Sequence, residues 1–519
     1  MASLPASPAA SGDVVASARR WIAYGALAAL FGVLLTNVLV SAHSGWVLIR
    51  FPFGFDYGEG IVWQQMRNML HGHAYGPLGV FPAIVYHYPP VYHLTVGALS
   101  ALTGIDPLAM GRAVSLLSAY GTAILLGMIA IQARPDQDRI VNLMVALLVG
   151  LIFLTCGPVE RWAPLMRVDM LSGLFGVAGI LLALRAIDRP RLAVLASVCF
   201  LLSIYAKQTS IAAPAAAFVG LMVVRPRIAF WIAGLSCAGG LAALGLLEWL
   251  TDGGFLRHIL FYNINRMQWD LIWRVADPIR LHAVYLAVAG GGAWLLSRDL
   301  KALWPERGKH GPRIAAIVTA IVYFEIKTVM LVMTAKSGAS YNYLIEWLGS
   351  AAILVGVAAR PAIAAATAQA RAAGRAHEPI ALPVLLLLAL AVQAKAIPPR
   401  VLTMRDARIE TQHDQAIVDR IRAASKPVIS DDMTLPIRAG RSVEWEPAIA
   451  AELGATGIYD QPAFIRMVAQ RKFAMFVTDG DRGDPDFESR YNPPVLAAIE
   501  RYYPNRQKIG HLILRTPAR

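Results

Sequence analysis

Charged side chains are scarce in this sequence. Aspartate, glutamate, lysine and arginine make up 16% of its 519 residues, while 56% of the residues are hydrophobic and the mean hydropathy is +0.51. Soluble domains carry about 25% charged residues, so the composition excludes an ordinary soluble domain. Several apolar runs reach the roughly 17–25 residues that cross a bilayer as a helix. The sequence therefore predicts a polytopic α-helical membrane protein.

Cysteine is also scarce, and the common nucleotide-binding and hydrolytic motifs are missing. The three cysteines, Cys156, Cys199 and Cys237, lie in or beside apolar runs without metal-ligand spacing. They are expected to be packing residues and imply no disulfide framework. The sequence has no GxxxxGK[ST], HExxH, GxSxG or CxxC pattern. These absences argue against an ATP-driven pump.

The basic residues follow a membrane pattern. The net charge is +14, but no basic stripe is interleaved with aromatic residues as single-stranded nucleic acid requires, so no nucleic-acid partner is predicted. Lysine and arginine cluster in short segments between apolar runs, as the positive-inside rule describes. Arg19 and Arg20 precede the first apolar run, which has no cleavable-signal pattern. This predicts a retained signal anchor and a cytoplasmic N-terminus.

Placing the basic segments in the cytoplasm predicts eleven crossings and an extracytoplasmic C-terminus. The apolar segment 87–103 does not fit this alternation of inside and outside segments, and it is interpreted as an interfacial or half-membrane helix. Alternatively, 87–103 crosses the bilayer and a further crossing restores the alternation, which gives up to 13 transmembrane helices. The predicted crossings lie near residues 21–42, 107–133, 140–158, 163–186, 191–206, 208–224, 229–250, 281–297, 314–335, 343–359 and 379–397.

The composition changes after the last crossing. Residues 1–397 are predicted to form a transmembrane domain and residues 398–519 a small extracytoplasmic α/β domain. Charged residues alternate with helically spaced apolar residues over 405–425, which predicts a helix. Short buried strands are expected over 427–430 and 473–478, with a closing strand over 509–514.

The loop predicted over 43–88 carries two carboxylates, Asp56 and Glu59, among aromatic residues. At helical spacing they share one face, and a carboxyl group near an apolar surface has a raised pKa that suits a general base. Alternatively, the two carboxylates have a structural role, because acidic residues stabilise the N-terminus of a helix, here an interfacial helix predicted over 57–71. Neighbouring candidates for substrate binding are Tyr57, His87 and Tyr88.

Other polar residues lie in or at the ends of apolar segments, where charges are costly and usually face a cavity or a partner. Snorkelling to the interface is the alternative, and Arg167 with Asp169 is also a candidate structural ion pair. The candidates for substrate binding are Arg167, Asp169, Lys207, Gln208, Tyr341, Asn342 and Glu346.

The external segment 251–280 carries four arginines against the positive-inside bias: Arg257, Arg266, Arg274 and Arg280. A guanidinium group matches phosphate oxygens bidentately. A specific anion such as phosphate is therefore predicted, with anionic lipid headgroups as the alternative.

Several stretches together resemble the membrane glycosyltransferases of the GT-C type, which include the protein O-mannosyltransferases and the aminoarabinose transferases of lipid A. The resemblance covers roughly residues 20–400. The similar stretches are Asp56 to Glu59, Tyr88-Pro89-Pro90-Val91-Tyr92-His93-Leu94, Gly111-Arg112-Ala113-Val114-Ser115, Arg167-Val168-Asp169-Met170, Lys207-Gln208-Thr209 and Tyr341-Asn342-Tyr343. The compared families have Asp and Glu adjacent, whereas Tyr57-Gly58 separates them here, so the identity of the base stays open.

The resemblance implies a GT-C-like helical fold in a bacterial inner membrane. It further implies transfer of a sugar from a polyprenyl-phosphate carrier to a glycan, lipid or protein acceptor at the outer face, usually with inversion. Asp56 would then be the general base, and Glu59 or Asp169 would orient a substrate. A divalent cation held by Asp56, Glu59 or Asp169 is one option; no other cofactor is implied.

The same resemblance implies that Arg167, Lys207 and the arginines of 251–280 stabilise the leaving phosphate. Two other functions remain as alternatives. One is a flippase for lipid-linked saccharides, which should show repeat-related halves that this sequence lacks. The other is a polymerase or ligase of lipid-linked oligosaccharides, which shares the donor chemistry.

Overall fold

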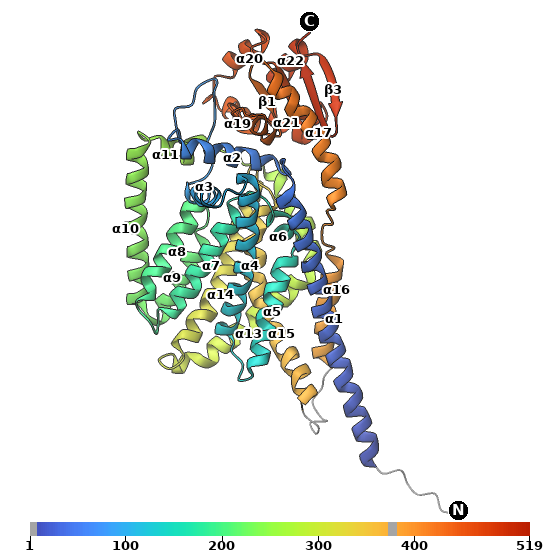
Figure 1. The fold of residues 1–519 in the computed structure, drawn as a ribbon. Helices are drawn as coiled ribbons and strands as arrows, with labels where there is room; N and C mark the ends of the chain where they lie inside the picture. The colour runs from blue at the N-terminus through green and yellow to red at the C-terminus, as the bar shows by residue number, and fades with distance from the viewer. Residues whose placement is uncertain (1–7, 372–380, 519) are drawn as a thin grey trace, which may run out of the picture.

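The computed structural model describes residues 8–371 and 381–518 and consists of a helical bundle capped by a small α/β domain (Figure 1). Helices coincide with all eleven predicted apolar segments. The long helices of the bundle are α1 (Pro8–Arg50), α4 (Pro107–Ala133), α5 (Arg139–Thr155), α7 (Asp169–Arg185), α8 (Leu192–Ala206), α9 (Ala212–Val224), α10 (Pro226–Leu250), α13 (Ala283–Leu303), α14 (Gly311–Val329), α15 (Leu344–Arg371) and α16 (Ala381–Ala396).

The length and apolar character of these helices identify the chain as a multi-pass membrane protein. Among the described residues, five helices are long and apolar enough to cross a bilayer, and six if the bent pair Trp269–Leu281 and Ala283–Glu306 counts as one span. Shorter apolar helices, including α5, α8, α9 and α16, complete the bundle. The number of crossings and the orientation of the termini therefore stay predictions.

Two helices at the end of the bundle that faces the C-terminal domain position the loop between α1 and α4. Figure 1 shows α2 (Tyr57–Leu70) lying across the bundle under the C-terminal domain, with α3 (Val91–Thr103) next to it. The backbone of α3 ends at Gly104, whose φ of 71° is the left-handed conformation that glycine adopts most readily at a helix end. The segment predicted over 87–103 thus contains a helix, and its position relative to the bilayer stays a prediction.

Short helical segments make up the remaining connections. Between α5 and α7 lies α6 (Gly157–Trp162), and the segment after α10 contains α11 (Gly254–Leu256), η1 (Arg257–Tyr262), η2 (Trp269–Val275) and α12 (Ala276–Leu281). After α13 and α14 come η3 (Trp304–Glu306), η4 (Met330–Ala335) and η5 (Tyr341–Tyr343).

The C-terminal domain contains one mixed four-stranded sheet. Its strands are β1 (Val428–Ser430), β2 (Met475–Asp479), β3 (Asn505–Ile509) and β4 (Leu512–Thr516), in the order β1-β2-β4-β3. β1 is parallel to β2, and the other pairs are antiparallel. The helices around it are α17 (Met404–Ala423), α18 (Thr434–Arg438), α19 (Pro447–Ala455), α20 (Gln461–Ala469), α21 (Pro485–Arg490) and α22 (Pro493–Tyr502).

The predicted strands over 427–430 and 473–478 are present as β1 and β2, whereas the closing strand over 509–514 is displaced. Ile509 pairs with Leu512, and Gly510 between them has a φ of 59°, which suits the tight turn of a hairpin. The last strand therefore begins at Leu512. Its partner β3 was not predicted because its residues are polar and mostly exposed.

The loop after α1 is part of the core of the C-terminal domain. Helix α1 continues to Arg50, so the loop begins at Phe51 and not at residue 43. Phe51 and Phe53 pack in one apolar cluster with buried residues of α17, β2 and β4. Residues 78–85 pack in a second cluster around Trp445 and Phe464. The loop and the domain thus share their apolar cores.

A partly exposed ion pair also holds the C-terminal domain against the bundle. Asp106 accepts a hydrogen bond from the backbone N–H of Ala109 and caps the N-terminus of α4. The guanidinium of Arg438, from α18, donates two hydrogen bonds to the same carboxylate, at 2.6 and 3.0 Å. Arg438 also lies over the ring of Trp63 on α2. The domain is therefore held against α2 and α4 by charge as well as by packing.

Candidate active site

Asp56 is the N-cap of α2 and is partly open to solvent. Its Oδ1 accepts hydrogen bonds from the backbone N–H of Gly58, at 3.0 Å, and from Nη1 of Arg167, at 2.9 Å. The side chain is 26% exposed. In the part of the chain that the structure describes, Oδ2 accepts no hydrogen bond. Asp56 is thus a fixed carboxyl group with one oxygen available to a ligand.

Glu59 has the opposite environment. It is fully buried, and its two oxygens accept from Nε and Nη2 of Arg112 at 2.8 and 2.7 Å and from the backbone N–H groups of Phe55 and Met166. Burial raises the pKa of the Glu59 carboxyl, but Arg112 and these donors outweigh burial and hold it below the ordinary value. The two carboxylates do not act as a pair, and the geometry favours a structural role for Glu59.

Arg112 is a residue that the sequence analysis did not assign to the site. Besides Glu59, its guanidinium donates to the backbone carbonyls of Leu48, Phe51 and Phe53 at 2.6 to 2.7 Å. All of its donors are therefore used within the protein. Arg112 ties the end of α1, the loop and α2 together, and so fixes the position of Asp56.

Arg167 connects Asp56 to the rest of the site. Its Nη1 holds Asp56, while its Nε is buried without a hydrogen-bond partner among the described residues. A Cβ atom on Gly58 would lie 1.3 Å from Nη1, so the guanidinium occupies the space that a side chain at position 58 would need. The alternative of an Arg167–Asp169 ion pair is not what the structure shows, because Arg167 pairs with Asp56 and Asp169 with Lys207.

We expect Gly58→Ala to lower activity by displacing Arg167. The added methyl group removes the space for the guanidinium, and a misplacement of about 1 Å in a reacting site costs about 10²-fold in rate. The matched control is Gly157→Ala, because a Cβ at Gly157 meets nothing within 4 Å. Equal turnover rates for the two purified variants would contradict the role given to Arg167.

Asp169, at the start of α7, forms a second polar cluster. Its Oδ1 accepts from Nζ of Lys207 at 2.6 Å and from Nδ2 of Asn342 at 2.9 Å. Lys207 also lies 5.0 Å from the ring centre of Tyr343. Oδ2 of Asp169 is buried without a hydrogen-bond partner among the described residues. The structure thus brings together Asp169, Lys207 and Asn342, which the sequence analysis names as separate candidates.

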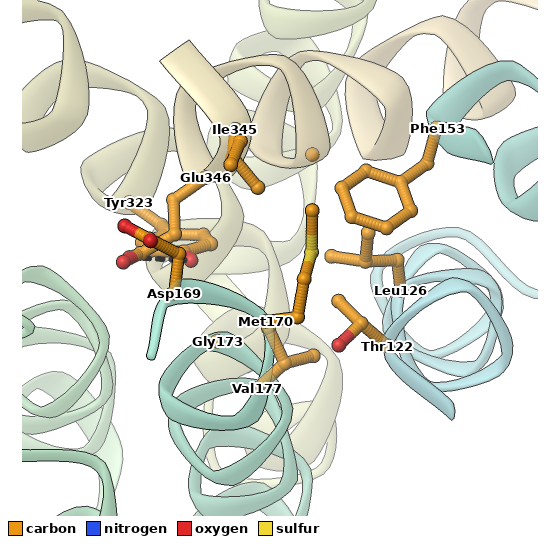
Figure 2. Close-up of a pocket in the computed structure, with 11 residues that line it drawn as sticks. Thr122, Leu126, Phe153, Asp169, Met170, Gly173, Val177, Tyr323, Ile345 and Glu346 are labelled. Carbon is orange, nitrogen blue, oxygen red and sulfur yellow. Dashed lines mark hydrogen bonds between the residues drawn. The ribbon is translucent and has the colours of Figure 1, made fainter. Parts of the chain in front are cut away.

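Glu346 lies next to this cluster. Figure 2 shows the carboxylates of Asp169 and Glu346 and the hydroxyl of Tyr323 at one side of a small cavity. Lys327 pairs with Glu346 at 3.2 Å, and Tyr323 donates to it at 3.1 Å. The cavity has room for about one water molecule. Lys327 and Tyr323 were not predicted as members of the site.

His87 is held between the loop and the C-terminal domain. Its Nε2 lies 3.0 Å from Oε2 of Glu446. Its backbone carbonyl accepts from Gln208 at 2.8 Å and Asn263 at 3.2 Å. The next residue, Tyr88, is fixed by the hydroxyl of Tyr75, which donates to its carbonyl. Glu446 therefore links the C-terminal domain to the segment that carries His87 and Tyr88.

The His87–Glu446 contact predicts a pH-dependent stability. Burial lowers the pKa of the His87 imidazole, but Glu446 outweighs it and raises the pKa above the ordinary value. The stabilisation is complete below about pH 6.5, the pKa of an unfolded histidine, and is lost as pH rises through the raised value. The melting temperature of wild type should exceed that of His87→Gln most at acid pH. A difference independent of pH would contradict this.

The remaining candidates are more dispersed. Tyr57 faces the C-terminal domain, with its hydroxyl accepting from the backbone N–H of Ala448 and the guanidinium of Arg490 over its ring. Tyr341 lies under Arg161, 5.9 Å from the ring centre. In the segment 251–280, Arg257 is exposed and without an ion-pair partner among the described residues.

Two arginines of this segment already have partners. Arg266 pairs with Glu452 and Arg280 with Asp277. These contacts do not favour a single anion site built from all four arginines.

The predicted metal ligands do not fit a divalent cation. Asp56, Glu59 and Asp169 each pair with a basic side chain of the protein. Among residues 8–371 and 381–518, no group of three His, Cys, Asp or Glu side chains could hold a metal ion.

Comparisons with known proteins identify solved structures that have a similar fold. No protein-family model and no curated protein matches the chain. The crystal structure of ArnT from Cupriavidus metallidurans bound to undecaprenyl phosphate superposes with a TM-score of 0.55 at 14% identity, over 93% of this chain and 98% of that one.

The oligosaccharyltransferase of Archaeoglobus fulgidus matches with a TM-score of 0.54 at 10% identity, over 94% of this chain and 74% of that one. That structure holds an inhibitory peptide and a dolichol-phosphate. Another structure of the same enzyme, with Zn and sulfate, has a TM-score of 0.52 at 11% identity, over 94% and 75%. The fold is thus the one seen in membrane glycosyltransferases of the GT-C type.

Proposed function

We propose that this protein, which has the fold of GT-C membrane glycosyltransferases, transfers a sugar from a polyprenyl-phosphate carrier to an acceptor. The observation that carries the proposal is the state of Asp56. One of its oxygens is fixed by Gly58 and Arg167, and the other is open to a ligand. A general base must hold its orientation while keeping a free oxygen for the proton.

The reaction is a displacement at the anomeric carbon of the sugar. The acceptor hydroxyl gives its proton to Oδ2 of Asp56, and its oxygen forms a new bond to that carbon. The bond between the carbon and the phosphate oxygen breaks, and the electron pair leaves with the polyprenyl phosphate. Attack from the face opposite the phosphate inverts the configuration.

Arg167 and Lys207 are the groups placed to stabilise the leaving phosphate. The Nε of Arg167 is buried without a hydrogen-bond partner in the described part of the chain, and Lys207 has donors beyond the one that Asp169 accepts. Preorganised donors of this kind stabilise charge that develops in a transition state. Tyr88, held by Tyr75, is proposed to line the same pocket.

The two predicted domains have separate roles in this proposal. Residues 1–397 hold the carrier lipid between apolar helices and supply the reacting groups. Residues 398–519, docked on the loop through Arg438 and Glu446, limit the space above Asp56 and so limit the acceptors. The acceptor is a glycan, lipid or protein hydroxyl at the extracytoplasmic face of a bacterial inner membrane.

Transport is the alternative from a different class. A flippase moves a lipid-linked sugar across the bilayer without breaking its bond to phosphate. The partly exposed, anchored carboxylate of Asp56 favours chemistry over transport. A polymerase or ligase would use the same donor chemistry on larger saccharides.

The test uses protein reconstituted in liposomes with radiolabelled polyprenyl-phosphate sugars and a membrane extract as the source of acceptor. The proposal predicts that the label leaves the carrier lipid and appears in the acceptor fraction. Label that reaches the other leaflet while still attached to its carrier would instead identify a flippase.

A further inference from the structure

We infer that Lys207 and Arg167 take the place of a divalent cation at this site, so that sugar transfer is independent of divalent metal. The inference rests on the proposed transferase function and names the groups that supply its positive charge. Its basis is the charge pairing of the acidic residues around the site.

Each of the three carboxylates is already neutralised by a cation of the chain. Asp56 pairs with Arg167 at 2.9 Å, Glu59 with Arg112 at 2.7 Å and Asp169 with Lys207 at 2.6 Å. The last two pairs are buried. The carboxylates come from two helix N-termini, and their partners come from other segments of the chain. A divalent ion would therefore meet no uncompensated negative charge here.

The ammonium of Lys207 occupies the position next to Asp169 and Asn342 that a divalent cation would need in order to bind their oxygens. The Oδ1 of Asp169 receives both the ammonium of Lys207 and the amide of Asn342. Carboxylate and amide oxygens are the ligands that Mg²⁺ and Mn²⁺ prefer, but here Asn342 turns its amide nitrogen to Asp169. A metal ion at Asp169 would lie against the ammonium, with like charges in a site that water does not screen. Lys207 and a divalent ion thus exclude each other.

A fixed ammonium and guanidinium can do what a metal ion does for a leaving phosphate. Arg167 keeps its buried Nε free, and Lys207 keeps donors beyond the one that Asp169 accepts. Both groups are positioned by carboxylates of the chain, Arg167 by Asp56 and Lys207 by Asp169. The positive charge is then part of the fold and not of a dissociable ion.

The test removes the ammonium and offers a metal ion instead. Wild type dialysed against EDTA should keep its transfer rate and its melting temperature, and added MgCl₂ or MnCl₂ should change neither. Lys207→Ala should lose transfer about 10²- to 10³-fold, as loss of one charge-stabilising group does. MnCl₂ should then raise the melting temperature of Lys207→Ala and recover part of its transfer.

Two controls complete the test. Lys207→Arg keeps a cation and should show no response to MnCl₂. The double variant Lys207→Ala/Asp169→Asn removes the ligand as well and should lose the rise in melting temperature.

The melting temperatures need no activity, so failure of the proposed function and failure of this inference are distinguishable. A wild-type melting temperature or transfer rate that falls in EDTA and recovers with Mg²⁺ or Mn²⁺ would overturn the inference.

Discussion

Replacing Asp56 by asparagine is expected to lower the rate of sugar transfer by about 10²- to 10⁴-fold, the contribution of a positioned general base. The amide has almost the same shape but cannot accept the proton of the acceptor hydroxyl. Asparagine caps a helix as well as aspartate does, so the backbone N–H of Gly58 keeps its acceptor and α2 keeps its N-terminus. The measurement is the initial rate of transfer, with the melting temperature as the check of folding.

Asp460→Asn is the matched control for this variant. Asp460 is the N-cap of α20 and accepts from the backbone N–H of Ala463 at 2.8 Å, but its side chain is exposed on the C-terminal domain. The same change of atoms at this cap should leave both transfer rate and melting temperature near wild type. If Asp56→Asn transfers sugar at the wild-type rate, Asp56 is not the general base.

Replacing Glu59 by glutamine is expected to destabilise the fold by about 3–5 kcal/mol, because it leaves the buried charge of Arg112 without its partner. The contact is fully buried and bidentate, so solvent cannot compensate for the lost charge. The expected result is a lower melting temperature and less folded protein in the membrane. The molecules that do fold should keep Asp56 in place and should still transfer sugar.

A double variant separates charge from packing at this position. Glu59→Gln with Arg112→Met removes both charges, and replacing a buried ion pair with uncharged groups is often close to neutral. The double variant should therefore recover part of the melting temperature lost in Glu59→Gln. Recovery would be incomplete, since Arg112 also holds three backbone carbonyls. A Glu59→Gln protein as stable as wild type would contradict a structural role for Glu59.

The helices of the bundle can be read from the sequence because long apolar runs need no tertiary information. The segment 107–133 is found as α4 with the same bounds, since Asp106 and Pro107 mark its start. The start of the loop could not be placed in this way. His43 and Ser44 look like loop residues, but the backbone of α1 continues through them to Arg50.

The site was harder to predict because its charges are matched across long distances in the chain. Sequence spacing puts Asp56 and Glu59 together, whereas the fold gives each a different arginine, at positions 167 and 112. Arg112 carried a usable signal, since a lone arginine within an apolar segment needs a partner. Glu446 carried none: nothing in its neighbourhood in the sequence indicates that it meets His87.

The most direct test of this account is the rate of sugar transfer per folded molecule for wild type, Asp56→Asn and Glu59→Gln, measured side by side with one polyprenyl-phosphate sugar. The account predicts that wild type and folded Glu59→Gln transfer at similar rates and that Asp56→Asn does not. Full transfer by Asp56→Asn together with loss in folded Glu59→Gln would move the base to Glu59 and contradict the site described above.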